Sequence, residues 1–237
     1  MWETPKANVG PEHRINVIIS NYYDILPARL QKLPNVTAED TQPLFEHIGK
    51  FGYVVLKKLL MAFYFDYDWA LWMDAEAIAV RPFSMVRAFR SYAQSPVVLH
   101  SRMSKSILMR RINAANAVML GRSMDSFGQL YWSMESLGWY IEKKVAVDLI
   151  QWIEDTHGQD FISVVLDMVA KHAMDVFEAN LFAMHIQARK LETVDSIYSK
   201  YQVLEVERAM LRFGMGELMR PHGTVPPQPN TFGSTCL

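Results

Sequence analysis

The sequence predicts an α/β fold with a mixed sheet in its first half and a helix-rich C-terminal half. Up to about residue 125, short apolar runs bounded by turn residues alternate with a helical pattern. Beyond that point, apolar residues recur at helical spacing over long stretches. This order of elements is typical of helices packed against a sheet.

The composition fits one folded domain with loose ends. The chain has 237 residues, of which 50% are apolar and 21% are charged, so it can bury a sizeable core. We expect a loosely ordered N-terminus over residues 1–13, a single domain over 14–219 and a proline-rich tail over 220–237.

Several classes of protein are disfavoured by composition. The longest apolar run, Leu59–Phe65, is far shorter than the roughly 20 residues that span a bilayer, so we expect no transmembrane segment. The first residues do not resemble a secretory signal, which favours a cytoplasmic location for the chain as written, although a fragment of a membrane-anchored enzyme would look the same. The single cysteine, Cys236, excludes an internal disulfide. A net charge of −1 argues against a protein built for bulk nucleic-acid binding.

The first half contains the predicted strands that matter most for function. Trp69–Met73 is a short apolar run between two aspartates and suits a central strand, and Ala77–Val80 reads as a second strand that Arg81-Pro82 ends. The helical spacing of Phe51–Phe65 predicts a helix before them. Ile15–Ser20 reads as an earlier strand, and Leu26–Pro43 as a loop with at most a short helix.

Later elements follow from the same patterns. Two further strands are predicted at Pro96–His100 and Ala114–Leu120. The remaining segments have helical spacing, and we expect helices at Tyr131–Thr156 and Val203–Phe213, with Phe161–His172 and Met174–Arg189 as two more helices or one bent helix.

The segment Asp74-Ala75-Glu76 is the strongest candidate for chemistry. Two carboxylates separated by one small residue follow the predicted strand Trp69–Met73. Ligands bind beyond the carboxyl ends of strands in open α/β sheets, and Mg²⁺ or Mn²⁺ prefers one or two carboxylates plus substrate phosphates. A bare D-x-E is common, and for an isolated instance a solvated turn is the better interpretation. The apolar strands on both sides and the Arg-Pro-Phe that follows favour a metal site here.

A basic stretch begins next to this motif. From Ala77 to Arg122 the sequence has eight basic residues and no acidic one. A stretch of one sign beside acidic flanks can focus its field on an anionic ligand. A solvated basic face whose partners come from elsewhere in the sequence is an equally favoured interpretation.

The segment WALWMDAEAIAVRPFS (residues 69–84) resembles the metal-binding segment of glycosyltransferases with the GT-A fold. Those enzymes carry D-x-D between two apolar strands, often followed by R-P-F. The preceding FGYVVLKKLLMAFYFDYDW, and the later FGQLYWSMESLGWYIEKKVAVDLIQWIEDTHG and DVFEANLFAMHI, are similar to the flanking regions of these families. The resemblance covers roughly residues 50–190 and is clearest around Asp74. It departs from the family at Glu76, where aspartate is usual, and in its short front half.

The resemblance implies a GT-A-like, Rossmann-type mixed sheet and a metal-dependent transfer of a sugar. The donor would be a nucleoside diphosphate sugar, above all a UDP-sugar, and the acceptor a glycan or another hydroxyl compound. Residues 14–125 would bind the donor and metal, and residues 126–219 the acceptor. Asp74 and Glu76 would hold Mn²⁺ or Mg²⁺, while Asp74, Lys57 and Arg81 would contact the donor.

Three further residues are candidates for this chemistry. An inverting enzyme needs a carboxylate that takes the acceptor's proton, and Glu178 or Glu135 could supply it. Glu178 is favoured because it matches the family's second helix motif, although a structural acid paired with an arginine is the commoner role for each. His222 could be a third metal ligand, whereas a surface histidine in a flexible tail is the more frequent case.

Two other functions remain open from sequence. A non-catalytic GT-A-like binding or assembly protein is suggested by Glu76 and by the short front half. Another metal-dependent enzyme on nucleotides or phosphate esters, such as a nucleotidyltransferase, would also use paired acids and basic groups.

Overall fold

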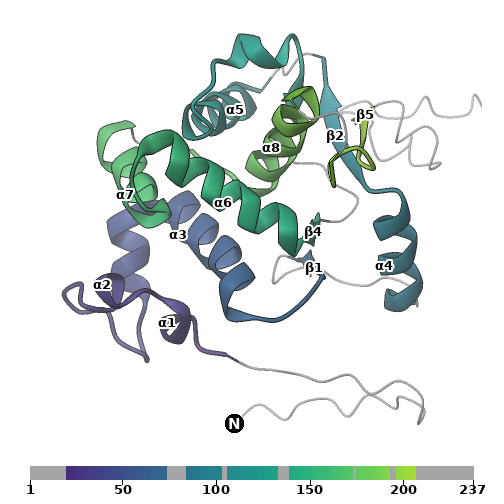
Figure 1. Cartoon of the computed structure of the whole chain (residues 1–237). Helices are drawn as coiled ribbons and strands as arrows, with labels where there is room; N and C mark the ends of the chain where they lie inside the picture. The colour runs from purple at the N-terminus through teal and green to yellow at the C-terminus, as the bar shows by residue number, and fades with distance from the viewer. Residues whose placement is uncertain are drawn as a thin grey trace, which may run out of the picture.

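The structure is a computed structural model that describes residues 20–73, 84–102, 106–132, 139–172, 175–192 and 196–206. Within these ranges helices predominate and the strands form two small sheets (Figure 1). The helices are α1 (Tyr22–Ile25), α2 (Ala28–Gln31), α3 (Gln42–Tyr64), α4 (Met85–Gln94), α5 (Ile107–Met119), α6 (Lys143–His157), α7 (Phe161–His172) and α8 (Glu178–Glu192), with a 3₁₀ turn η1 (Met124–Phe127). The strands are β1 (Trp69–Trp72), β2 (Val97–Ser101), β3 (Tyr131–Trp132), β4 (Trp139–Glu142) and β5 (Gln202–Glu205).

The two sheets differ in how their strands pair. Strands β1 and β4 are antiparallel, with Trp72 opposite Trp139. In the other sheet β2 is the middle strand, antiparallel to β3 and parallel to β5. The mixed α/β class and the helix-rich later part of the chain are therefore confirmed.

Helices α3, α6 and α7 pack against one another on one side of the molecule, and β2, β5 and α4 lie on the other (Figure 1). Helix α3 breaks at Gly49, whose φ of +71° is a conformation that favours glycine. After the break, Val55, Leu59 and Ala62 repeat at helical spacing and are buried. This regular apolar stripe holds the second half of α3 against the core.

Helix α8 is the most deeply buried element at the centre of this packing. It contacts α3, α5, α6 and β3, and apolar side chains along it are buried on several sides. Three polar side chains are buried with them: Glu178, Asn180 and His185. Buried polar groups cost free energy unless they find partners, so the contacts of these three side chains shape the interior.

Several predicted elements are confirmed by the structure. Strand β1 occupies the predicted Trp69–Met73 run, and β2 matches Pro96–His100. The predicted helix at Phe51–Phe65 is the second part of α3, and Phe161–His172 is α7. The predicted strands at 15–20 and 77–80 fall outside the described residues except for Ser20.

Three sequence predictions are wrong in part or whole. Residues 114–119 are helical and belong to α5, not to a strand, because Ser106 caps the helix and Ile112, Ala115 and Met119 form one buried helical face. The predicted helix from Tyr131 begins only at Lys143, because strands β3 and β4 precede it. The predicted helix from Val203 begins as strand β5, which pairs with β2.

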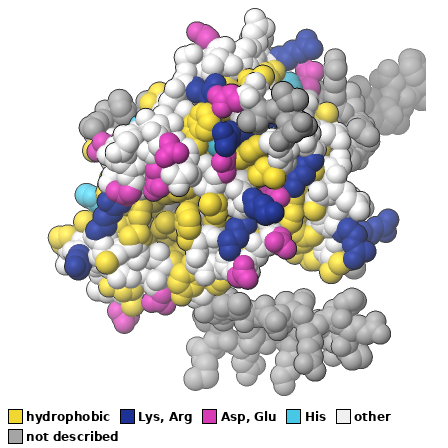
Figure 2. Space-filling view, in the orientation of Figure 1, with side chains coloured by type: hydrophobic (Ala, Val, Ile, Leu, Met, Phe, Trp, Pro, Cys, Tyr) yellow, Lys and Arg dark blue, Asp and Glu magenta, His cyan; other side chains and the backbone are white. Residues whose placement is uncertain are grey.

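Two other observations bear on partners. Within the described ranges, no helix combines the length and the apolarity needed to cross a bilayer. The face shown in Figure 2 carries both basic and acidic side chains, interspersed with exposed hydrophobic ones.

Candidate functional site

An open pocket of about 480 Å³ lies between the C-terminal half of α3 and strand β1. Its walls combine two lysines with aromatic side chains, and they include Lys57, Lys58, Phe65, Tyr67, Trp72 and Met73. A concave, mostly apolar site with a few charged groups is the usual form of a small-molecule pocket. Met73 lines this pocket and directly precedes Asp74 in the sequence.

The two lysines of this pocket have different environments. Lys57 is exposed, and within the described part of the chain it forms no ion pair. The side chain of Lys58 is only 14% exposed, and its ammonium donates a hydrogen bond of 2.6 Å to Glu178 Oε1. Lys57 is therefore the lysine better placed to meet a ligand from solvent, while Lys58 is fixed in the wall.

Two tryptophans surround the Lys58 ammonium. It lies 4.6 Å from the ring centroid of Trp139 and 5.9 Å from that of Trp72. Because Trp72 and Trp139 are directly opposite in the β1–β4 pair, their side chains project from the same face of the sheet. Aromatic faces attract cations, so the two indole rings stabilise the Lys58 ammonium in the position where it binds Glu178.

Glu178 is held from behind by helix α5. Asn116 of α5 is fully buried, and its side-chain amide binds both backbone groups of Phe177, the residue before Glu178. The Phe177 N–H donates to Asn116 Oδ1 at 3.2 Å, and Asn116 Nδ2 donates to the Phe177 carbonyl oxygen at 3.2 Å. Asn113, one helical turn earlier, holds the backbone of Trp132 in the same way. The Asn113 and Asn116 side chains thus fix β3 and the start of α8.

Replacing Asn116 by leucine tests this role. The variant keeps the side chain's approximate volume but leaves the N–H of Phe177 buried without a partner, while the Phe177 carbonyl keeps its hydrogen bond from Leu181 N–H at 2.9 Å. The unsatisfied N–H costs about 2 kcal/mol in the free energy of unfolding. Urea denaturation measures the loss. Val118→Ala, at an exposed position of the same helix, is the control and should change little. Equal stability of the Asn116→Leu variant and the wild type would show that Asn116 does not fix the start of α8.

Tyr67 adds a polar group to the aromatic wall. Its hydroxyl is buried and has no hydrogen-bond partner within the described part of the chain. Burial raises the pKa of Tyr67 to about 12, so the hydroxyl keeps its proton and can donate it in a hydrogen bond at neutral pH.

A second buried polar cluster lies away from this pocket, between α6 and α8. Asp148 accepts hydrogen bonds from His185 Nε2 at 2.8 Å, from Arg189 Nε at 2.9 Å and Arg189 Nη2 at 2.8 Å, and from the Tyr198 hydroxyl. Burial alone raises the pKa of Asp148, but the bonds from His185, Tyr198 and Arg189 outweigh burial and hold the pKa well below its usual range. Burial lowers the pKa of His185, which favours its neutral form. These hydrogen-bond donors occupy both oxygens of the Asp148 carboxylate. We therefore interpret the cluster as a structural one that holds α6 and α8 together.

The predicted site residues are only partly within the described residues. Lys57 lines the pocket, and Glu178 is buried behind it as the partner of Lys58. Asp74, Glu76, Arg81, Glu135 and His222 lie outside the described residues. Across the ranges the structure describes, no group of three or more His, Cys, Asp or Glu side chains could hold a metal ion.

The aromatic part of the site is not among the predicted site residues. Phe65 and Trp72 fall within the predicted helix and strand, and Tyr67 lies between them, yet all three line the pocket. Their density in FYFDYDWALW was the available signal, because so many aromatic residues within one turn and one short strand cannot all enter the core.

The lysines and aromatic rings that line the pocket are side chains able to contact a small anionic ligand with an aromatic or apolar part. Comparison with known proteins adds no family to this description. A scan against protein-family models finds no matching model, and searches of the curated proteins and of the solved structures find no significant match.

Proposed function

We propose that this chain is a metal-dependent glycosyltransferase that binds a nucleoside diphosphate sugar in the pocket between α3 and β1. One observation carries the proposal. The pocket presents lysines and aromatic rings together, and its described wall includes Met73, the residue before Asp74-Ala75-Glu76 in the sequence. A nucleoside diphosphate needs the same combination: an aromatic surface for the base, cations for the phosphates and carboxylates for a bound metal ion.

Each part of the donor has a candidate partner in this proposal. Lys57, which is exposed at the pocket, would contact the diphosphate. Phe65 and Tyr67 would pack against the base. Asp74 and Glu76 have the oxygen ligands that Mn²⁺ and Mg²⁺ prefer, and Arg81 would add positive charge after them. The GT-A-like arrangement of the complete sheet belongs to the same proposal.

The proposed reaction breaks the bond between the anomeric carbon and the diphosphate. Negative charge grows on the leaving diphosphate, and Lys57 would stabilise it. A bound divalent cation would supply further charge neutralisation at the same oxygens. The sugar becomes oxocarbenium-like, as in glycoside hydrolysis, and the acceptor hydroxyl replaces the diphosphate. Glu178 and Glu135 remain the candidates for taking the acceptor's proton, and the full burial of Glu178 requires the acceptor to reach it through the pocket wall.

The test is a donor screen that identifies the released product. We expect UDP release from at least one of a panel of UDP- and GDP-sugars in the presence of Mn²⁺ and simple saccharide acceptors. Release should stop with a chelator and in Asp74→Ala. It should persist in Asp68→Ala, which removes an exposed carboxylate before β1 and leaves the motif intact.

Other products would point to the other functions. Release of pyrophosphate from nucleoside triphosphates would contradict the glycosyltransferase proposal and favour a nucleotidyltransferase. Binding of donors without any turnover, in a sample whose folding is verified, would contradict an enzymatic role and favour a binding protein.

A further inference from the structure

Two buried polar atoms beside Lys58 lack hydrogen-bond partners within the described part of the chain. They are Glu178 Oε2 and Trp139 Nε1. The Glu178 side chain is fully buried, and its other oxygen is already bonded to Lys58. Buried polar groups are nearly always hydrogen-bonded, so two unsatisfied atoms in one place call for an explanation such as a ligand or an ordered water.

The two atoms belong to residues that both neighbour the Lys58 ammonium, and they have opposite hydrogen-bonding character. The Glu178 carboxylate and the Trp139 ring both lie within 5 Å of the same ammonium group, at 2.6 and 4.6 Å. The carboxylate oxygen can only accept a hydrogen bond, and the indole N–H can only donate one. A hydroxyl group donates and accepts at once, so it satisfies both atoms. An anionic group would be repelled by Glu178, and a cation by Lys58.

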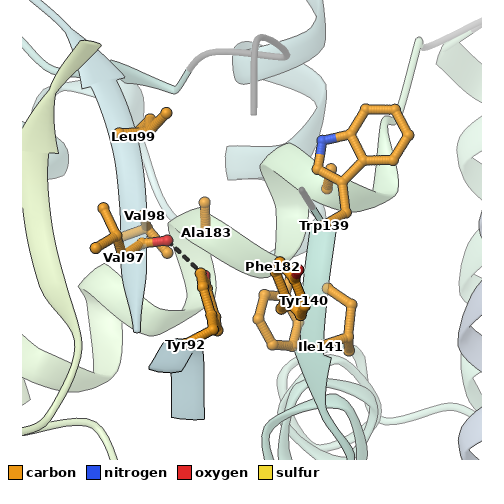
Figure 3. Close-up of a pocket in the computed structure, with 10 residues that line it drawn as sticks. Tyr92, Val97, Val98, Leu99, Trp139, Tyr140, Ile141, Phe182 and Ala183 are labelled. Carbon is orange, nitrogen blue, oxygen red and sulfur yellow. Dashed lines mark hydrogen bonds between the residues drawn. The ribbon is translucent and has the colours of Figure 1, made fainter. Parts of the chain in front are cut away.

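Open space lies beside Lys58 and beside Trp139, whereas Glu178 is not among the described residues that line either cavity. Lys58 lines the pocket between α3 and β1, and Trp139 lines a small gap between β2 and β4. Figure 3 shows the indole nitrogen of Trp139 on the side of its ring that faces Leu99 across this gap. The gap has a volume of about 30 Å³, which takes one hydroxyl group or one water molecule.

We infer that Glu178 and Trp139 form a subsite for a hydroxyl group of a sugar ring, next to the pocket that takes the nucleoside diphosphate. This inference rests on the proposed function, because the sugar is the hydroxyl-bearing part of the donor. In this arrangement one oxygen of Glu178 holds Lys58 and the other orients the sugar, which leaves Glu135 as the candidate for taking the acceptor's proton.

Trp139→Phe is the decisive variant. Phenylalanine keeps an aromatic ring beside Lys58, although a smaller one, and removes the N–H donor. Calorimetry with Mn²⁺ should measure the affinities for UDP, UDP-glucose, UDP-galactose and UDP-N-acetylglucosamine. We expect the variant to bind at least one UDP-sugar about five-fold more weakly than the wild type, the effect of one neutral hydrogen bond, while its affinity for UDP changes less than two-fold. Trp152→Phe is the control, because Trp152 Nε1 already donates to Leu120 carbonyl oxygen at 3.1 Å.

The outcomes separate this inference from the proposed function. If the wild type binds neither UDP nor any UDP-sugar, the proposed function itself is wrong. If it binds UDP but none of the three UDP-sugars, or if Trp139→Phe weakens UDP and the UDP-sugars equally, the subsite is wrong and the nucleotide pocket stands. Unchanged affinities of Trp139→Phe for every UDP-sugar would show that the two atoms bind a water molecule only.

Discussion

Replacing Lys58 by methionine is expected to lower the free energy of unfolding by about 3–5 kcal/mol. Methionine matches the aliphatic part of the lysine but removes the ammonium that Glu178 binds at 2.6 Å. The carboxylate would then be fully buried without a cation, and such an unpaired charge is among the most destabilising defects a single substitution creates. Urea or thermal denaturation measures the loss.

Two further variants make this result specific. Lys57→Met removes the neighbouring charge, which is exposed, and should leave the stability unchanged. Combining Lys58→Met with Glu178→Gln removes both charges and should recover part of the loss, since a neutral amide is cheaper to bury than a carboxylate. If Lys58→Met is as stable as Lys57→Met, the ion pair does not hold α3 to α8.

Replacing Asp148 by asparagine is expected to cost about 3 kcal/mol at pH 7. Asparagine has a similar shape, but it loses the charge that binds Arg189 and one of the two oxygens that accept from His185, Arg189 and Tyr198. Hydrogen bonds to charged groups contribute more than neutral ones, although the part-exposed side chain of Asp148 reduces the effect.

The contribution of Asp148 also depends on pH. Its pKa in the folded chain lies below the ordinary 3.8, so the unfolded chain binds the proton more readily and stability is lost as the pH falls below about 4. The pKa of His185 is also lowered from 6.5, which adds an earlier loss as the pH falls below that value. Arg189, Arg122 and Tyr198 are the other titratable groups that face this pair.

Unfolding measured between pH 7 and pH 3 tests this dependence. The stability difference between the wild type and Asp148→Asn should shrink below about pH 4, because Asp148 of the unfolded wild type then takes up a proton while the folded carboxylate is still ionised. Asp155→Ala, at an exposed position of the same helix, should follow the wild-type curve. A difference that stays constant down to pH 3 would mean that Asp148 is not the group whose ionisation stabilises this cluster.

The local patterns that predicted elements correctly are those with one clear period. The helix at Phe161–His172 and the second part of α3 have regular apolar stripes, and strand β1 is a short apolar run between aspartates. These features act within one element, so the sequence contains the whole signal. Ala114–Leu120 has no single clear apolar period, because its small and apolar residues suit a buried strand and a buried helix equally well.

Elements that depend on distant partners could not be predicted. Strand β5 exists because it pairs with β2, and β4 exists because it pairs with β1, roughly seventy residues earlier in the chain. In both segments the local spacing favoured a helix. Tertiary pairing outweighs such weak local preferences.

In the candidate site, too, features that depend on contacts between distant residues could not be predicted from the sequence. Lys57 is a donor contact that the family resemblance implies, and it lines the pocket. The pairing of Lys58 with Glu178 joins residues 120 positions apart, and no pattern in the sequence indicates it. The unsatisfied atoms of Glu178 and Trp139 become visible only when burial and hydrogen bonds are known.

The most direct test of the central claim is calorimetric titration of UDP into the full chain with and without Mn²⁺. The account predicts Mn²⁺-dependent binding that disappears with a chelator and in Asp74→Ala, and that weakens in Lys57→Met. UDP binding that neither the chelator nor Asp74→Ala alters, or the absence of any binding by the folded chain, would contradict a metal-dependent nucleotide site between α3 and β1.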